Sequence, residues 1–206
     1  IKEIILDIAF PGMCALCGKN LDENSKNKLI CQNCLTDIPI NTALTCSVCL
    51  ARLADNQKTC HKDAPFLLAA ASRYENEKIQ RLIQAFKYRK QTALAKPLAE
   101  IIINHLNSLN LKLTDYLIMP IPLHPARLRH RGFNQSQLIG SILSSRLKIP
   151  INSQDLIRIK DNPPQTETKN HEERRANLIG AFAVNQQAGV QAKKIILLDD
   201  VFTSGA

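Results

Sequence analysis

The sequence predicts an α/β fold in which a parallel sheet is flanked by helices and preceded by a small cysteine-rich module. Two observations lead to this prediction. All seven cysteines fall at or before residue 60 of a 206-residue chain. Beyond them, apolar residues at helical spacing alternate with short apolar runs, an order that builds parallel sheets. We therefore expect a cysteine-rich module over residues 1–63 and an α/β domain over residues 64–206.

The cysteines form three Cys-x2-Cys pairs and one remainder: Cys14/Cys17, Cys31/Cys34, Cys46/Cys49 and Cys60. An odd count, without a recognisable signal peptide, argues against a disulfide scaffold and favours a cytoplasmic protein. Each pair places two thiolates on one tight turn, and two pairs supply the four ligands of a tetrahedral Zn²⁺ site. The first two pairs therefore predict a zinc site, and the module reads as a zinc ribbon.

A second metal site is expected from the remaining cysteines, but its ligand set is open. Cys46, Cys49 and Cys60 supply three ligands, and His61 or Asp63 is the fourth. Imidazole binds zinc well, whereas adjacent residues such as Cys60 and His61 rarely chelate one ion comfortably. The alternative is a degenerate second ribbon that holds no metal.

Helices and strands follow in alternation. Residues 74–86 predict a helix, because four apolar side chains recur at i, i+3, i+4 and i+7: Ile79, Leu82, Ile83 and Phe86. Residues 94–106 predict a second helix with Pro97 in its first turn. Residues 116–121 predict a strand that Pro120 and Pro122 end.

A basic loop is expected next, at the carboxyl end of that strand. It carries Arg127, Arg129 and Arg131, whose guanidinium groups suit phosphate oxygens, and Gly132, which permits a close backbone approach. An inert, solvated basic loop is the alternative. Asn134, with Gln137 three residues on, predicts the start of a helix.

The last third of the sequence predicts an edge strand over 149–157, a polar connection over 161–169 and a capped helix from Asn170. Ile195–Leu198 then forms a continuous apolar run, typical of a strand buried on both faces of a parallel sheet. Asp199 and Asp200 follow at its carboxyl end, where ligands of open α/β sheets bind.

The segment after the acid pair, Thr203-Ser204-Gly205, reads as a turn whose backbone N–H groups attract an anion. Carboxylates beside an anion cradle suit a sugar phosphate. The plain alternative is that Asp-Asp merely ends a strand and Thr-Ser-Gly caps a helix.

Residues Ile195 to Ala206 resemble the phosphoribosyl-pyrophosphate (PRPP) motif of type I phosphoribosyltransferases. The resemblance implies a type I phosphoribosyltransferase-like sheet. It also implies that Asp199 and Asp200 hold the ribose hydroxyls and that Thr203 to Ala206 bind the 5′-phosphate. Since the motif ends within its phosphate loop, we expect the natural chain to continue.

The segment "PIPLHPARLRHRGFNQS" is similar to the signature of the ComF/GntX-type family, and "FKYRK" at 86–90 and "RRANLIGAF" at 174–182 are similar to two further blocks of it. The resemblance covers essentially the whole chain. It departs where the fourth cysteine pair is reduced to Cys60 and Asp63. It implies a role in DNA uptake during natural competence, with PRPP, single-stranded DNA and the competence helicase machinery as partners.

In phosphoribosyl transfer, Mg²⁺ and basic groups stabilise the departing pyrophosphate. Arg129 or Arg131, with Gly132, would meet it here, and Lys87 is a further candidate. The net charge of +9 favours anionic partners of either kind.

The alternative function is a non-catalytic single-stranded DNA-binding factor that retains the PRPP fold. Its basic candidates are Arg127, Arg129, Arg131, Arg89 and Lys90. Only nine side chains are aromatic, six Phe and three Tyr, which disfavours base stacking. No apolar stretch approaches the ~20 residues of a membrane-spanning helix.

Overall fold

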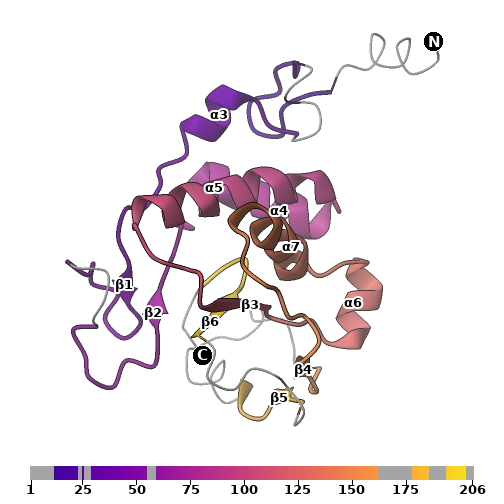
Figure 1. Cartoon of the computed structure of the whole chain (residues 1–206). Coiled ribbons are helices and arrows are strands. Elements are labelled where there is room, and N and C mark those ends of the chain that lie inside the picture. Colours follow the sequence, from indigo (N-terminus) through magenta and orange to yellow (C-terminus); the bar gives the residue numbers. More distant parts are fainter. Residues whose placement is uncertain are drawn as a thin grey trace. The chain divides into compact units, whose positions relative to one another are not determined.

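The computed structural model describes residues 12–22, 25, 29–54, 59–161, 178–185 and 194–202 (Figure 1). The chain divides into two compact units, Ile1–Leu111 and Lys112–Ala206. The first unit holds the cysteine-rich segment together with two helices, α4 (Glu77–Tyr88) and α5 (Ala95–Ser108). The expected helix start at Asn170 and the Thr203–Ala206 turn lie outside the described residues.

The cysteine-rich segment contains little regular structure. Helix α3 (Gln32–Thr36) is short, and β1 (Thr45–Cys46) pairs antiparallel with β2 (Leu67–Leu68). A small core of buried side chains supports this ribbon: Leu44, Cys46, Leu53 and Leu109. A small apolar core of this kind is typical of segments that bound metal stabilises.

The two helices of the first unit confirm the sequence pattern. Asn76 caps α4, since its side-chain oxygen accepts hydrogen bonds from the N–H groups of Lys78 and Ile79. The apolar positions that predicted this helix are buried: Ile79, Leu82, Ile83 and Phe86. A single 3₁₀ turn (η1, Thr92–Leu94) leads into α5, and Pro97 lies in the first turn of α5 as expected.

The second unit is built on a small parallel sheet. Strand β3 (Tyr116–Pro120) pairs in register with β6 (Lys194–Leu198), from Tyr116 opposite Lys194 to Pro120 opposite Leu198. On the other side of β3, Ile118 forms a parallel bridge with Ile151. The observed architecture is therefore an α/β fold with a small parallel sheet.

Helix α7 (Gln135–Leu147) packs closely on this sheet. Gly140 lies at the contact, where an added Cβ would come within 3.0 Å of Ile151 Cδ1 and 3.3 Å of Leu198 Cδ2. The absence of a side chain thus lets helix and sheet approach, and the helix start follows the expected cap at Asn134.

The prediction of a basic loop is wrong, because the three arginines lie on a short helix, α6 (Pro125–Arg131). Pro125 occupies the first helical turn, where its missing N–H costs nothing. His124 Nδ1 accepts a hydrogen bond from the N–H of Ala126 at 3.3 Å, and Gly132 ends the helix at φ +87°. Gly132 is therefore the C-cap of α6.

Two strand predictions also need correction. The single edge strand over 149–157 is divided into the bridge at Ile151 and a later strand, β4 (Leu156–Arg158), which pairs antiparallel with β5 (Phe182–Val184). The cause is a turn at Asn152, whose side-chain oxygen accepts hydrogen bonds from the N–H groups of Gln154 and Asp155.

Strand β6 is not buried on both faces. Leu197 is 60% exposed, whereas Leu198 is 7% exposed. Within the described residues β6 pairs with β3 alone, so its burial is that of an edge strand. Among the described residues, no helix combines the length and apolar character needed to cross a membrane.

Candidate functional site

The first cysteine cluster is built on a tight turn and a helix start. Cys14 N–H donates to Lys19 O at 2.8 Å, and Gly18 N–H donates back to Cys14 O at 2.9 Å. Gly18 has φ +69°, which glycine adopts without strain. Cys31 is the N-cap of α3, and Cys34 lies inside that helix. The turn and the helix end thus bring four thiols together.

The sulfur geometry of this cluster fits a tetrahedral metal. The four Sγ atoms lie within 4.8 Å of one another, and Cys17 Sγ is 3.8 Å from Cys31 Sγ. Zn–S bonds of about 2.3 Å at tetrahedral angles place sulfurs about 3.8 Å apart. Cys14 and Cys34 are buried, so a bound ion would be shielded on that side.

The thiols of this cluster cannot all ionise without a cation. Burial raises the pKa of Cys14, but hydrogen bonds, from Cys17 and Cys31 among others, outweigh it and bring the pKa down to about 6. Burial and the neighbouring sulfurs raise the pKa of Cys34 to about 12. One sulfur is therefore ionised and another protonated near neutral pH, and a Zn²⁺ ion would let both bind as thiolates.

The second cluster repeats the first turn. Cys46 N–H donates to Ala51 O at 2.9 Å, and Leu50 N–H donates to Cys46 O at 2.9 Å. Leu50 takes the place that Gly18 has in the first turn, and its φ is +59°. The two turns are thus copies of one knuckle, and the second copy carries a leucine in the left-handed region.

His61, and not Asp63, joins the second cluster. The donor atoms of Cys46, Cys49, Cys60 and His61 all lie within 4.8 Å of one another. His61 Nδ1 is 3.6 Å from Cys46 Sγ, which matches the sulfur–nitrogen distance of about 3.6 Å around tetrahedral zinc. Adjacent residues were expected to chelate one ion poorly. Cys60 and His61 nevertheless face one centre, with Cys60 Sγ 3.2 Å from His61 Nδ1.

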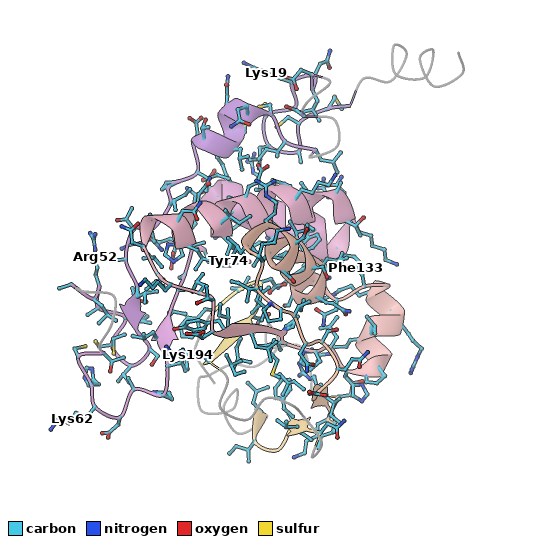
Figure 2. All side chains as sticks on the ribbon, viewed as in Figure 1. Lys19, Arg52, Lys62, Tyr74, Phe133 and Lys194 are labelled. Atoms are coloured by element: carbon cyan, nitrogen blue, oxygen red, sulfur yellow. The ribbon has the colours of Figure 1, made fainter. Side chains whose placement is uncertain are left out.

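The second cluster is the more exposed of the two. Cys46 is buried, but Cys49, Cys60 and His61 are exposed. A hydrogen bond from the Cys49 backbone chiefly lowers the pKa of Cys46, to about 6. The Cys49 side chain chiefly raises the pKa of Cys60, to about 11. Figure 2 shows the two clusters as separate groups of sulfur atoms, one near Lys19 and one between Arg52 and Lys62.

The acid pair of the second unit lies at the carboxyl edge of the parallel sheet. Asp199 and Asp200 follow β6 directly. Asp199 Oδ1 accepts a hydrogen bond from Ser136 Oγ at 3.3 Å and one from the N–H of Asp200 at 2.8 Å. Asp199 is exposed and Asp200 partly exposed, so both carboxylates remain accessible to a ligand.

The N-terminal turn of α7 meets the same edge. Asn134 Nδ2 donates to Ile121 O at 3.0 Å, which ties the helix start to the residue after β3. Arg131 donates to Gln135 Oε1 at 2.8 Å, and Gln135 is itself buried. The edge therefore combines two carboxylates with the positive end of a helix dipole.

The arginines of α6 differ in their surroundings. Arg127 Nε pairs with Asp161 Oδ1 at 3.3 Å, and His124 Nδ1 is 3.5 Å from Asp161 Oδ2. Arg129 is exposed, and Arg131 contacts Gln135. The other basic candidates, Lys87, Arg89 and Lys90, belong to the first unit.

Sequence reasoning missed two groups at this edge, Ser136 and Arg158. Arg158 lies in β4 over the ring of Phe182, with 5.4 Å between the guanidinium carbon and the ring centroid. Burial lowers the pKa of Arg158 and the charge of Arg127 lowers it further, while Asp161 and Asp199 oppose both effects. The available signal was the position of Arg158 directly after the edge strand predicted over 149–157. Residues that follow strands at this edge of a sheet carry ligand groups.

Comparison with known proteins gives relatives across nearly the whole chain. The double zinc ribbon domain family matches residues 5–63. Competence protein F of Haemophilus influenzae is 28% identical over 207 residues, which cover 98% of this chain and 82% of the relative. DNA utilization protein YhgH of Salmonella typhimurium is 26% identical, covering 95% and 80%. Competence protein ComFC of Bacillus subtilis is 23% identical, covering 94% and 84%. No solved structure gives a significant match.

Proposed function

From the homology of this chain to the ComF-type competence proteins, we propose that it is a PRPP-binding, phosphoribosyltransferase-like protein that serves DNA uptake in natural competence. We place it in the cytoplasm, where metal-binding thiols stay reduced. The N-terminal part is a double zinc ribbon that holds two structural Zn²⁺ ions. The second unit carries the PRPP site.

The observation that carries the PRPP proposal is the setting of Asp199. It follows a strand of a parallel sheet, at the edge where ligands of such sheets bind, and Ser136 orients its carboxylate. In the proposed complex, Asp199 and Asp200 accept the ribose hydroxyls, and Thr203 to Ala206 wrap the 5′-phosphate. Mg²⁺, Arg129, Arg131 and Gly132 serve the pyrophosphate end.

Calorimetric titration of the natural protein with PRPP and Mg²⁺ tests this proposal. Exchange of either aspartate for asparagine keeps its shape but removes a charged acceptor, worth about 1.5–3 kcal/mol. PRPP affinity should therefore fall by about tenfold or more while the melting temperature changes little. Unchanged affinity in the Asp199→Asn, Asp200→Asn double variant would show that the pair only ends a strand.

Single-stranded DNA is the second candidate ligand, alone or beside PRPP. Two relatives of this chain are named for DNA utilization or competence, the net charge is +9, and Arg129, Arg89 and Lys90 are exposed. Binding to phosphates releases counterions, so affinity should fall with salt at a slope near −0.7 per contact. Affinity that ignores salt, or that survives alanine at Arg127, Arg129 and Arg131, removes this candidate.

A further inference from the structure

The two cysteine clusters differ in how far solvent reaches their sulfur atoms. In the first cluster three cysteines are buried or half-buried, and Cys17 is the exposed one. In the second cluster Cys46 is buried, whereas Cys49 and Cys60 are both exposed. Figure 2 shows this second group of sulfur atoms between Arg52 and Lys62. A dissolved oxidant can therefore reach two neighbouring sulfurs in the second cluster but one in the first.

The two exposed sulfurs of the second cluster are also close together. Cys49 Sγ lies 3.2 Å from Cys60 Sγ, although the residues are 11 positions apart in the chain. In the first cluster, the exposed Cys17 Sγ lies 3.8 Å from Cys31 Sγ. A disulfide bond is about 2.05 Å long, so the second pair needs the smaller approach, about 1.1 Å against about 1.8 Å. Small shifts of two surface segments can supply it.

The ligands of the first cluster are held more firmly by the backbone. Cys31 caps the start of helix α3, and its N–H donates to Cys14 Sγ at 3.4 Å. Such hydrogen bonds hold a metal ligand in place and stabilise its charge. In the second cluster, Cys60 and His61 are neighbours in the chain, a spacing that rarely lets two residues bind one ion comfortably. Cys60 is therefore the ligand that the second site releases most easily.

We propose that Cys49 and Cys60 form a reversible disulfide when the protein meets a small disulfide oxidant, and that its formation releases zinc from the second cluster alone. The disulfide rests on the positions and exposure of the two sulfurs. The release of metal also rests on the proposed function, in which the second ribbon holds a Zn²⁺ ion.

The chemistry is two successive thiol–disulfide exchanges. The Cys49 thiolate attacks one sulfur of glutathione disulfide, which forms a mixed disulfide and expels one glutathione thiolate. The Cys60 thiolate then attacks the Cys49 sulfur of that mixed disulfide, closes the Cys49–Cys60 bond and expels the second glutathione thiolate. The two cysteines lose two electrons, and the oxidant gains them.

The second site cannot keep its ion after this step. Cys46 and His61 are the two ligands that remain, and tetrahedral zinc needs four. Exposed disulfides have higher reduction potentials than buried structural ones, so a dithiol reopens the bond and zinc can return. The second ribbon thus carries a reversible redox switch, and the first ribbon stays metal-bound.

Treatment of the zinc-loaded natural protein with glutathione disulfide tests the switch. A chromogenic chelator measures the released zinc, and mass spectrometry of proteolytic peptides identifies the disulfide. We expect about one of two zinc ions to leave with formation of the Cys49–Cys60 bond, and the other ion to leave at least about tenfold more slowly. Dithiothreitol and added zinc should restore the original metal content.

Ligand exchanges that retain zinc provide the variants. Cys60→His replaces one zinc ligand by another and removes the second thiol, so this variant should hold two ions and keep both in the oxidant. Cys31→His is the matched control, because it makes the same exchange in the first cluster and should still lose the second ion. Cys34→Ser, which lacks the first ion, should lose the one ion that it holds.

The peptide map of the wild type decides the matter even where Cys60→His fails to fold. A Cys17–Cys31 disulfide, equal release rates for both ions, or the absence of a Cys49–Cys60 bond overturns the switch. If the wild type holds two ions and the oxidant removes neither, the double zinc ribbon stands and the switch fails. If it holds one ion and the Cys49–Cys60 bond still forms, the disulfide stands and the proposed second zinc fails.

Discussion

Ser136 Oγ lies 3.3 Å from Asp199 Oδ1, so a buried hydroxyl at the start of α7 is directed at the carboxylate that follows β6. The two residues are 63 positions apart in the chain. This hydrogen bond couples the helix start to the strand end and fixes one of the two acids of the proposed PRPP site.

Exchange of Ser136 for alanine should therefore affect both stability and ligand binding. The loss of a hydrogen bond to a charged group costs about 1.5–3 kcal/mol when the acceptor is not rehydrated, and less here because Asp199 is exposed. We expect the free energy of unfolding, measured with urea, to fall by about 1 kcal/mol and PRPP affinity to fall several-fold. Ser141→Ala is the control, because Ser141 is exposed on the same helix and its hydroxyl donates to Gln137 O, within that helix. An equal loss in both variants would contradict a special role for Ser136.

The fourth ligand of the second cluster can be identified by metal analysis. His61 faces the three sulfurs and Asp63 does not belong to the cluster. We expect about two zinc ions per wild-type chain, about one in His61→Ala, and about two in Asp63→Ala. Retention of both ions in His61→Ala, or loss of one in Asp63→Ala, would reverse the ligand assignment. Cys34→Ser should lose the other ion, at the first cluster.

Local signals in the sequence were sufficient for the parts of the fold that depend on neighbouring residues. The cap at Asn134, the apolar face of α4 and the strand before Asp199 all follow from spacing within a few positions. The first cysteine cluster was predictable for the same reason, since each Cys-x2-Cys pair is one turn.

Features that depend on tertiary contacts were not predictable in this way. Helix α6 has seven residues, and the His124 cap and Pro125 determine where it starts. These signals are weak, and the basic composition of the segment suggested a loop instead. The setting of Arg158 depends on the pairing of β4 with β5, which places its guanidinium over the ring of Phe182. The choice of His61 over Asp63 depends on how the chain returns to Cys46, which spacing alone does not determine.

The leucine in the second knuckle offers a test of backbone strain. Leu50 has φ +59° and is 55% exposed, and the corresponding residue of the first knuckle is Gly18. A left-handed conformation costs a non-glycine residue about 1–2 kcal/mol, whereas glycine adds about 0.5–1 kcal/mol of unfolded-state entropy. Leu50→Gly should therefore stabilise the protein by about 0.5 kcal/mol and slow zinc release to a chelator. Faster release of zinc would show that the exposed leucine stabilises the knuckle by packing.

A buried histidine is hydrogen-bonded to the segment that leads into the second ribbon. His105 is fully buried in α5, and its Nδ1 donates to Asn41 O at 2.6 Å. Asn41 in turn donates to Ala71 O at 2.9 Å and, through its side chain, to Ala70 O at 2.6 Å. His105 Nε2 has no hydrogen-bond partner among the described residues. The neutral ring thus connects α5 to Asn41, and Asn41 connects the residues before β1 to the residues after β2.

Stability should consequently fall with acid in a way that depends on His105. Burial lowers its pKa below the ordinary 6.5, and the hydrogen bond to Asn41 only partly opposes this. The unfolded chain therefore binds the proton more readily than the folded one, so stability is full above about pH 6.5 and is lost as the pH falls below that value. Asparagine at position 105 can still donate to Asn41 O but does not titrate. Urea unfolding of wild type and His105→Asn across this pH range should give a steeper loss for the wild type, with about 1.4 kcal/mol for each unit by which the pKa is lowered. Acid loss from the zinc thiolates is common to both proteins and cancels in the difference. Parallel curves for the two proteins would show that His105 is not protonated on unfolding and that the depressed pKa is wrong.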